Sequence, residues 1–551
     1  MPKPVKATKG GGRLLRMNMS HYIPLPLDSL MHALLKEIPD EKDKLRFIDF
    51  ARRLHHLYRS RITNQSWRLR KGFQLFANNV TVDLGFTEEI VEAEEDSFID
   101  NFHRTMMEAN FELLSQDTYQ DALNSEYTLN LDLELDTNAL DSSFLKRFFL
   151  HHEDELGDAA DVTRHVLVYH RGYGLDKTKG LFIIEKVDVL FRNMFHVLWR
   201  GLQLLLLFLS VWKWPAILRG DMEDDDAETE ASLAAQTADT MPFDPSLSVT
   251  EHSVAQSRQV ILRKSLEGLI AAAPFSTLFS VTQLQEPTFK EMVVLYRTAE
   301  QRDEAAQRPG IPPSISVKSF KNIPVADFEI VLPCQRPTTR ALDLVKVLAA
   351  VLVALATVAT KFWQFYEEEK EENDWHTSTW QERFSEIAPL LIIVGTYASK
   401  ILVQIRTQQA TYQNLMTNYL YQRTTDSDDG VRAHLEDSTI LQEVKESLLA
   451  FFFLWRCTPS GPVTLEDLDM HVEQFLLTID NNVDFEVDDA VQKLVADGIV
   501  NINTEELEPE SQLKNLSISR AITKLEQQWQ VFFSNPNQEC PYCPFLKHDD
   551  L

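Results

Sequence analysis

The sequence predicts an α+β membrane protein: a two-helix transmembrane hairpin, a helical and β N-terminal region and a C-terminal winged-helix-like domain. Three observations predict this class. Two apolar stretches lie at 344–365 and 387–405. Helical periodicity in 21–150 changes to short, β-branched runs in 160–333. Finally, 459–535 reads as helix, helix, strand-turn and helix, joined to the hairpin by a helical connector at 407–457.

Composition narrows the classes of function. The 551 residues carry 83 acids and 54 bases, for a net charge of -29. Such an acidic chain repels phosphate backbones, so no nucleic-acid partner is expected. Four cysteines are too few for a disulfide scaffold and indicate a reducing compartment. A mean hydropathy of -0.23 excludes a polytopic transporter.

The N-terminal region begins with a basic segment, 1–20, which reads either as a disordered tail or as a targeting peptide. Helical spacing of apolar residues then predicts helices through 21–150. The stretch 52–71 is strongly basic and reads either as a solvated face or as a contact for anionic lipid. The residues assigned to that contact are Arg52, Arg53, Arg68, Arg70 and Lys71.

Short runs at 165–174, 180–191, 289–297, 315–320 and 327–333 predict strands in an α+β domain over 160–333. The segment "RGYGLDKTKG" within it reads as a basic hairpin loop, or as a site where Arg171, Lys177 and Lys179 hold a phosphate or lipid headgroup. A short apolar helix is expected at 202–212. The insert 221–251 has ten acids and no base, so we expect it to be disordered.

The two apolar stretches have the length of membrane spans, and the acidic connector 366–386 between basic outer flanks fits the positive-inside pattern of a hairpin. The alternative is a buried antiparallel helix pair in a soluble domain. Small residues four apart in each stretch favour close helix packing and a homo-oligomer. The predicted membrane anchors are Lys346, Lys361, Trp363, Lys400 and Arg406.

In 459–535, Thr464 and Asp467 predict a capping box, and Gly498 predicts a helix C-terminus. This region holds 15 acids and four bases, which favours a protein partner over DNA. The flexible tail 536–551 contains Cys540 and Cys543 in "CPYC", a motif that resembles a glutaredoxin active site. Too little chain remains there for the βαβ unit of a redox site. Cys540, Cys543 and His548 also allow a metal site, but a closed zinc site needs four ligands, so the motif reads best as a tail without chemistry.

Several long motifs together resemble the transmembrane protein 143-like family, defined by domain of unknown function 3754. The motifs recur in order over about residues 20 to 535 and include "HYIPLPLDSLMHALL", "FARRLHHLYRSR", "LVYHRGYGLDKTKGLFIIEKVDVL", "EPTFKEMVVLYR", "FKNIPVADFEIVLP" and "YLYQRTTDSDDGVRAHLEDSTILQEVKESLLAFFFL". The resemblance implies an integral membrane protein, mitochondrial in animals, with plastid relatives. It implies no established activity and no catalytic residues.

The sequence shows no HExxH, GxSxG, P-loop or dinucleotide motif. We therefore assign no catalytic residue, cofactor or metal ligand, and an enzyme is not the expected class. The leading hypothesis is a membrane-anchored scaffold or adaptor that binds a protein through its acidic C-terminal domain. The alternative is a lipid-binding or lipid-processing protein that acts at the membrane surface.

Overall fold

The structure is a computed structural model. It describes residues 13–77, 87–123, 133–152, 156, 159–183, 186–187, 190, 258–264, 280–307, 311–337, 356, 359–360, 363, 380–457, 463–479, 483–502 and 511–534. The predicted segments 202–212, 221–251 and 536–551, with Cys540 and Cys543, lie outside these ranges.

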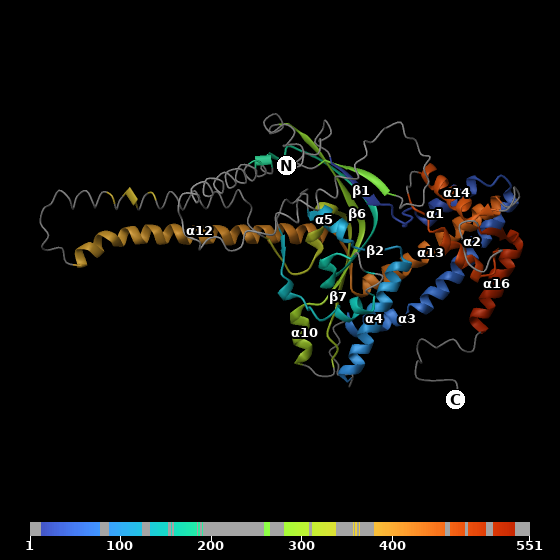
Figure 1. Cartoon of the computed structure of the whole chain (residues 1–551), viewed down its shortest axis with the longest axis horizontal. Coiled ribbons are helices and arrows are strands. Elements are labelled where there is room, and N and C mark those ends of the chain that lie inside the picture. Colours follow the sequence, from blue (N-terminus) through green and yellow to red (C-terminus); the bar gives the residue numbers. More distant parts are fainter. Residues whose placement is uncertain are drawn as a thin grey trace, which may run out of the picture.

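A five-stranded antiparallel sheet stands at the centre of the molecule (Figure 1). Its strands, in spatial order, are β2 (Glu112–Leu113), β4 (Leu167–Gly180), β6 (Thr282–Tyr296), β7 (Ser316–Pro324) and β9 (Thr424–Ser427). The long central strands are rich in Val, Leu, Phe and Tyr, which favour a pleated, half-buried surface. Two short pairs lie beside the sheet: β1 (Arg13–Asn18) with β5 (Arg258–Arg263), and β3 (Leu133–Leu135) with β8 (Gln335–Pro337).

Each face of the sheet is covered by its own hydrophobic core. On one face, Tyr169, Val293 and Leu295 pack with Phe73, Phe102 and Leu435. On the other face, Val168, Met292 and Val294 pack with Leu114 and Phe328. The helices and turns of this half are α3 (Trp67–Phe76), α4 (Glu88–Glu108), α5 (Gln116–Leu123), η1 (Thr137–Ala139), α6 (Lys146–His151), η2 (Asp161–Arg164), α10 (Ala299–Ala306) and η4 (Val325–Val331).

A third core joins the two ends of the chain. Phe47 stacks on Trp455 and meets Phe452 edge-on, and Phe50 stacks on Phe451. The elements that share this core are α1 (Leu27–Lys36), α2 (Glu41–Gln65), α13 (Asp429–Cys457), α14 (Leu465–Thr478), α15 (Val487–Ala496), α16 (Ile518–Ser534) and the sheet β10 (Val463–Thr464), β12 (Gln512–Asn515), β11 (Val500–Ile502). The winged-helix-like region therefore shares its core with the N-terminal helices, and its independence as a domain stays a prediction.

The segment before α1 connects the central sheet to this third core. The Ser20 hydroxyl accepts a hydrogen bond from the Gly172 backbone N–H of β4 at 3.1 Å. His21 Nδ1 lies 3.1 Å from the Asp484 carbonyl, and the Ile23 carbonyl accepts from Lys445 Nζ at 2.9 Å. The positive φ of Gly172, +64°, and the Tyr22 ring beside it explain why a glycine occupies this strand position.

Among the described residues, no helix is long and apolar enough to cross a membrane. The predicted transmembrane hairpin and the integral-membrane localisation are therefore wrong. The stretch 387–405 belongs to α12 (Trp380–Arg423), where Thr396, Ser399 and Lys400 interrupt the apolar residues and a polar half continues to Arg423. Figure 1 shows α12 extending away from the body of the molecule. Of the stretch 344–365, only 356, 359–360 and 363 are described, and they are helical.

Other sequence predictions have mixed outcomes. The mixed helix and sheet content is confirmed. The capping box is confirmed, since the Thr464 side chain accepts from the Asp467 N–H. Gly498 follows α15 with a φ of +70°. Two predicted strands are wrong: 327–333 falls largely in the 3₁₀ turn η4, and the described residues 183, 186, 187 and 190 are helical. "RGYGLDKTKG" belongs to strand β4 and is not a loop.

Candidate functional site

Three carboxyl groups gather around one ammonium between α13 and α15. Glu443 and Glu446 stand one turn apart on α13, and Asp489 and Lys493 stand one turn apart on α15. Lys493 Nζ contacts Glu443 and Asp489 and lies 3.3 Å from a Glu446 oxygen. Asn110 donates to the other Glu446 oxygen at 2.8 Å. We call these four charged residues the Lys493 cluster.

Burial sets the electrostatics of the Lys493 cluster. It raises the pKa of Glu443 to about 8 and that of Glu446 to about 7, and the attraction of Lys493 offsets only part of this effect. Burial alone lowers the pKa of Lys493, but the carboxylates of Glu446, Glu443 and Asp489 outweigh it and raise that pKa. One ammonium thus faces three acids, and two of them, Glu443 and Glu446, have pKa values near neutral pH.

The Lys493 cluster also has the spacing of a metal site. Ligand oxygens of Glu443, Glu446 and Asp489 lie within 4.8 Å of one another in the described part of the chain. Three carboxylates are suitable ligands for a divalent cation. However, Lys493 already contacts all three, so the arrangement reads as an internal ion network.

A second acidic group surrounds Asp469 of α14. Asp469 Oδ1 is buried and has no hydrogen-bond partner in the described ranges. Burial, followed by the carboxylates of Glu473, Asp484, Asp488 and Glu466, raises the pKa of Asp469 to about 7. The four charges that act on this carboxyl are all negative.

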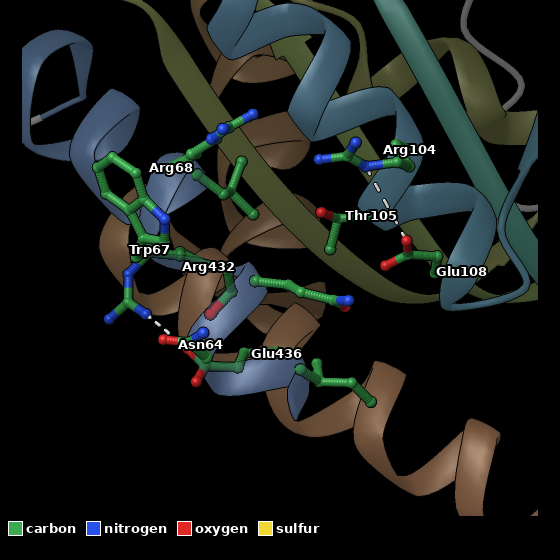
Figure 2. Close-up of a pocket in the computed structure, with 12 residues that line it drawn as sticks. Asn64, Trp67, Arg68, Arg104, Thr105, Glu108, Arg432 and Glu436 are labelled. Carbon is green, nitrogen blue, oxygen red and sulfur yellow. Dashed lines mark hydrogen bonds and ion pairs between the residues drawn. The ribbon is translucent and has the colours of Figure 1, made fainter. Parts of the chain in front are cut away.

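A pocket of about 390 Å³ lies where α2 ends and α3 begins, against α4 and the first turns of α13. Figure 2 shows Arg68 of α3 and Arg104 of α4 both pointing to one side of the pocket, while Arg432 of α13 lies near Trp67 and pairs with Glu436. The lining residues are Ile62, Asn64, Gln65, Ser66, Trp67, Arg68, Leu69, Arg104, Thr105, Glu108, Arg432 and Glu436.

Most of the basic residues predicted for lipid contact form ion pairs within the chain. Arg52 and Arg53 pair with Asp49, and Arg53 also pairs with Glu526. Arg70 lies 3.2 Å from Glu436, and Lys71 lies 2.6 Å from Glu94. Arg68 lines the pocket. The predicted basic face is thus largely neutralised by neighbouring carboxylates.

Arg171 is buried and therefore unavailable to a headgroup. Its guanidinium is 2% exposed, lies 2.5 Å from Glu291 and donates to the Ala109 carbonyl at 2.8 Å. The rings of Tyr22 and Phe111 flank it. Burial raises the pKa of Glu291, but hydrogen bonds and charge from His434 and Arg171 lower it to about 2. Arg171 thus joins the sheet to the end of α4 and to the N-terminal segment, and Glu291 reaches α13 through His434.

Lys177 and Lys179 are exposed at the end of β4. Leu175 shares their side of the strand, and it is 42% exposed. Leu181 and Ile183 follow, with exposed fractions of 47% and 41%. These five residues form a basic and apolar surface, which we call the β4 tip.

Two of the predicted membrane anchors, Lys400 and Arg406, lie on α12. Lys400 and Arg406 are exposed, and so is Trp363, with an exposed fraction of 66%. Lys346 and Lys361 lie outside the described residues.

Sequence reasoning missed the Lys493 cluster, Arg104 and Arg432. These groups meet from helices that are far apart in the sequence. One local signal was present: Glu443 and Glu446 interrupt the apolar face of "LQEVKESLLAFFFLW" at positions that share one side of a helix. An acid on such a face predicts a buried partner.

Residues 289–430 match the model of DUF3754, a family described as protein of unknown function. The match begins in β6 and ends at the start of α13, so it covers the second half of β6, then β7, α12 and β9. No curated protein and no solved structure matches the chain.

Proposed function

We propose that this protein is a non-enzymatic adaptor that binds a basic, amphipathic segment of a partner protein. The binding surface is the side of α14 that carries Glu466, Met470, Glu473 and Leu477, which we call the α14 face. The observation that carries the proposal is the acidity around Asp469, where four other acids act on one carboxyl. Repulsion of this kind is relieved when a partner brings positive charge.

Exposed apolar side chains lie among these acids. Met470 and Leu477 are 46% and 56% exposed. They stand two turns apart on α14, and Glu466 and Glu473 flank them at helical spacings of three and four residues. Apolar anchors between acids fit the apolar face and basic flanks of an amphipathic helix.

The same acidity disfavours a nucleic-acid partner. A winged helix that reads DNA presents basic side chains on its second helix. Here that position is taken by α15, whose Asp488 and Asp489 lie in its first turn and whose Lys493 is held by three acids.

The adaptor proposal is tested with the full chain and a labelled amphipathic peptide. The peptide has Leu at helical spacing on one face and Lys on the flanks of that face. We expect binding by fluorescence polarisation that weakens as salt rises. The double variant Glu466→Lys and Asp488→Lys should lose about tenfold or more in affinity. The matched control reverses two exposed acids of α10, Glu300→Lys and Glu304→Lys, and should bind as the parent does. Equal losses in both double variants contradict a specific α14 face.

A second candidate function is contact with an anionic lipid surface through the β4 tip. Exposed Leu175, Leu181 and Ile183 beside Lys177 and Lys179 combine apolar area with positive charge. Flotation of the full chain with vesicles containing phosphatidylserine tests it. We expect Lys177→Glu with Lys179→Glu to abolish binding. Binding that survives this change contradicts lipid contact through the β4 tip.

We also propose that the relationship to the transmembrane protein 143-like family extends beyond the DUF3754 match. The motifs on both sides of 289–430 support this assignment. An alignment of family members over 20–535 tests it: relatives should keep charge-compatible residues at 443, 446 and 493.

A further inference from the structure

We propose that the pocket at the α2–α3 junction binds the phosphate group of a small phosphate ester. The ester is either a soluble metabolite or the headgroup of a lipid. This site is distinct from the α14 face and the β4 tip, so it does not depend on either proposed function. Its volume of about 390 Å³ lies within the range of small-molecule pockets.

The charge of the pocket favours an anion. Three guanidinium groups line it, from Arg68, Arg104 and Arg432, against the carboxyls of Glu108 and Glu436. Both Arg70 and Arg432 contact the same Glu436 oxygen, at 3.2 and 3.1 Å, so this carboxylate is already neutralised.

The second acid, Glu108, lies 3.9 Å from Arg104, and burial raises its pKa. Arginines outnumber acids in the lining, with Arg68, Arg104 and Arg432 against Glu108 and Glu436. The opening near Arg68 and Arg104 is therefore positive.

The geometry favours phosphate among anions. Guanidinium groups donate paired hydrogen bonds that match the oxygens of a phosphate. Arg68 and Arg104 come from different helices and point to the same side of the pocket (Figure 2). The half-buried Asn64 also lines the pocket, and its amide N–H₂ group supplies neutral donors.

The start of α3 adds to this arrangement. Ser66 precedes the helix, yet its hydroxyl donates to the Thr63 carbonyl at 3.0 Å and does not cap α3. Residues 66–69, which form the first turn, line the pocket. The first turn of α3 and the last turn of α2 therefore both line the cavity that the arginines surround.

The test uses the full chain with three probes at constant ionic strength: inorganic phosphate, glycerol 3-phosphate and a soluble short-chain phosphatidic acid. Binding is followed by calorimetry and by ³¹P NMR. We expect at least one ester to bind with a fitted stoichiometry of one site. Arg104→Gln should weaken that binding about tenfold or more, because one charge-assisted contact is lost.

The control variant is Arg164→Gln, which removes an arginine that is 75% exposed and lies outside the pocket. It should bind as the parent does. Circular dichroism and the thermal midpoint verify that both variants are folded. Preference for phosphatidic acid identifies a lipid headgroup, and equal binding of both esters identifies the phosphate as the recognised group.

The proposal is overturned if no ester binds the parent chain. It is also overturned if Arg164→Gln weakens binding as much as Arg104→Gln, since the effect then reflects overall charge. If Arg104→Gln and Arg68→Gln both bind like the parent, the ester occupies another place.

Discussion

Lys493→Met tests the Lys493 cluster directly. The change removes the ammonium that contacts Glu443, Glu446 and Asp489, while the methionine keeps an unbranched side chain of similar shape. The variant therefore probes the charge more than the packing of α15 against α13.

Removal of one partner from a buried ion pair costs about 3–5 kcal/mol. The Glu446 side chain is 3% exposed and that of Glu443 12%, so water cannot replace the ammonium there. Lys493 itself is 22% exposed, which screens part of the interaction. We therefore expect the free energy of unfolding to fall by about 3 kcal/mol, near the lower end of this range, when the carboxyls are ionised.

The loss should depend on pH. In the folded protein the pKa of Glu443 is about 8 and that of Glu446 about 7, above the ordinary value of 4.5. A carboxyl whose pKa is raised by folding destabilises the fold as pH rises from the unfolded toward the folded pKa. At pH 6 both carboxyls keep their protons in the parent protein, so the ammonium matters little. At pH 9 the parent pairs them with Lys493, and the variant cannot.

Urea unfolding of the full chain, followed by tryptophan fluorescence at pH 6 and pH 9, measures this effect. The control Lys524→Met removes an exposed lysine of α16 and should leave both midpoints unchanged. Adding Glu446→Gln to Lys493→Met should recover part of the loss at pH 9. Equal losses at the two pH values, or none at pH 9, would refute the reasoning.

Three further changes test other parts of the fold by the shift of the urea midpoint. Arg171→Met leaves Glu291 buried without its guanidinium and should cost about 3 kcal/mol or more; a neutral result means that Glu291 is not held by this pair. Gly172→Ala places a Cβ 2.9 Å from the Tyr22 ring at a φ of +64°, so we expect a loss of about 1–2 kcal/mol, and an unchanged midpoint contradicts the strain. Thr464→Ala removes the cap of α14 and should cost about 1 kcal/mol, whereas Thr464→Ser should retain most of it.

The helices and strands that could be predicted carry their signal locally. The capping box at Thr464 and Asp467 depends on residues three apart, and the strands at 167–174 and 289–296 depend on runs of β-branched and aromatic residues. Sequence reasoning failed where one composition fits both a strand and a turn. "DFEIVLP" has the composition of a strand, yet it forms the buried 3₁₀ turn η4 under the sheet.

The candidate sites were less predictable because their members are distant in the chain. Arg171 read as a surface base, but it is buried by Glu291, Phe111 and Tyr22. The pocket arginines meet from three helices, and Lys493 reaches α13 from α15. Nothing in the spacing of these residues specifies such contacts.

The sequence by itself determined the local elements, their caps and the acidity of the C-terminal region, since periodicity, turn chemistry and net charge depend on neighbouring residues. The tertiary structure alone decided which charges are buried, which pair and which remain at a surface. It did so because side chains such as Arg171 and Glu291, 120 residues apart, meet only when β4 and β6 align in register. Burial and pairing then shift the free energy of ionisation of each side chain, which the residue type alone does not set.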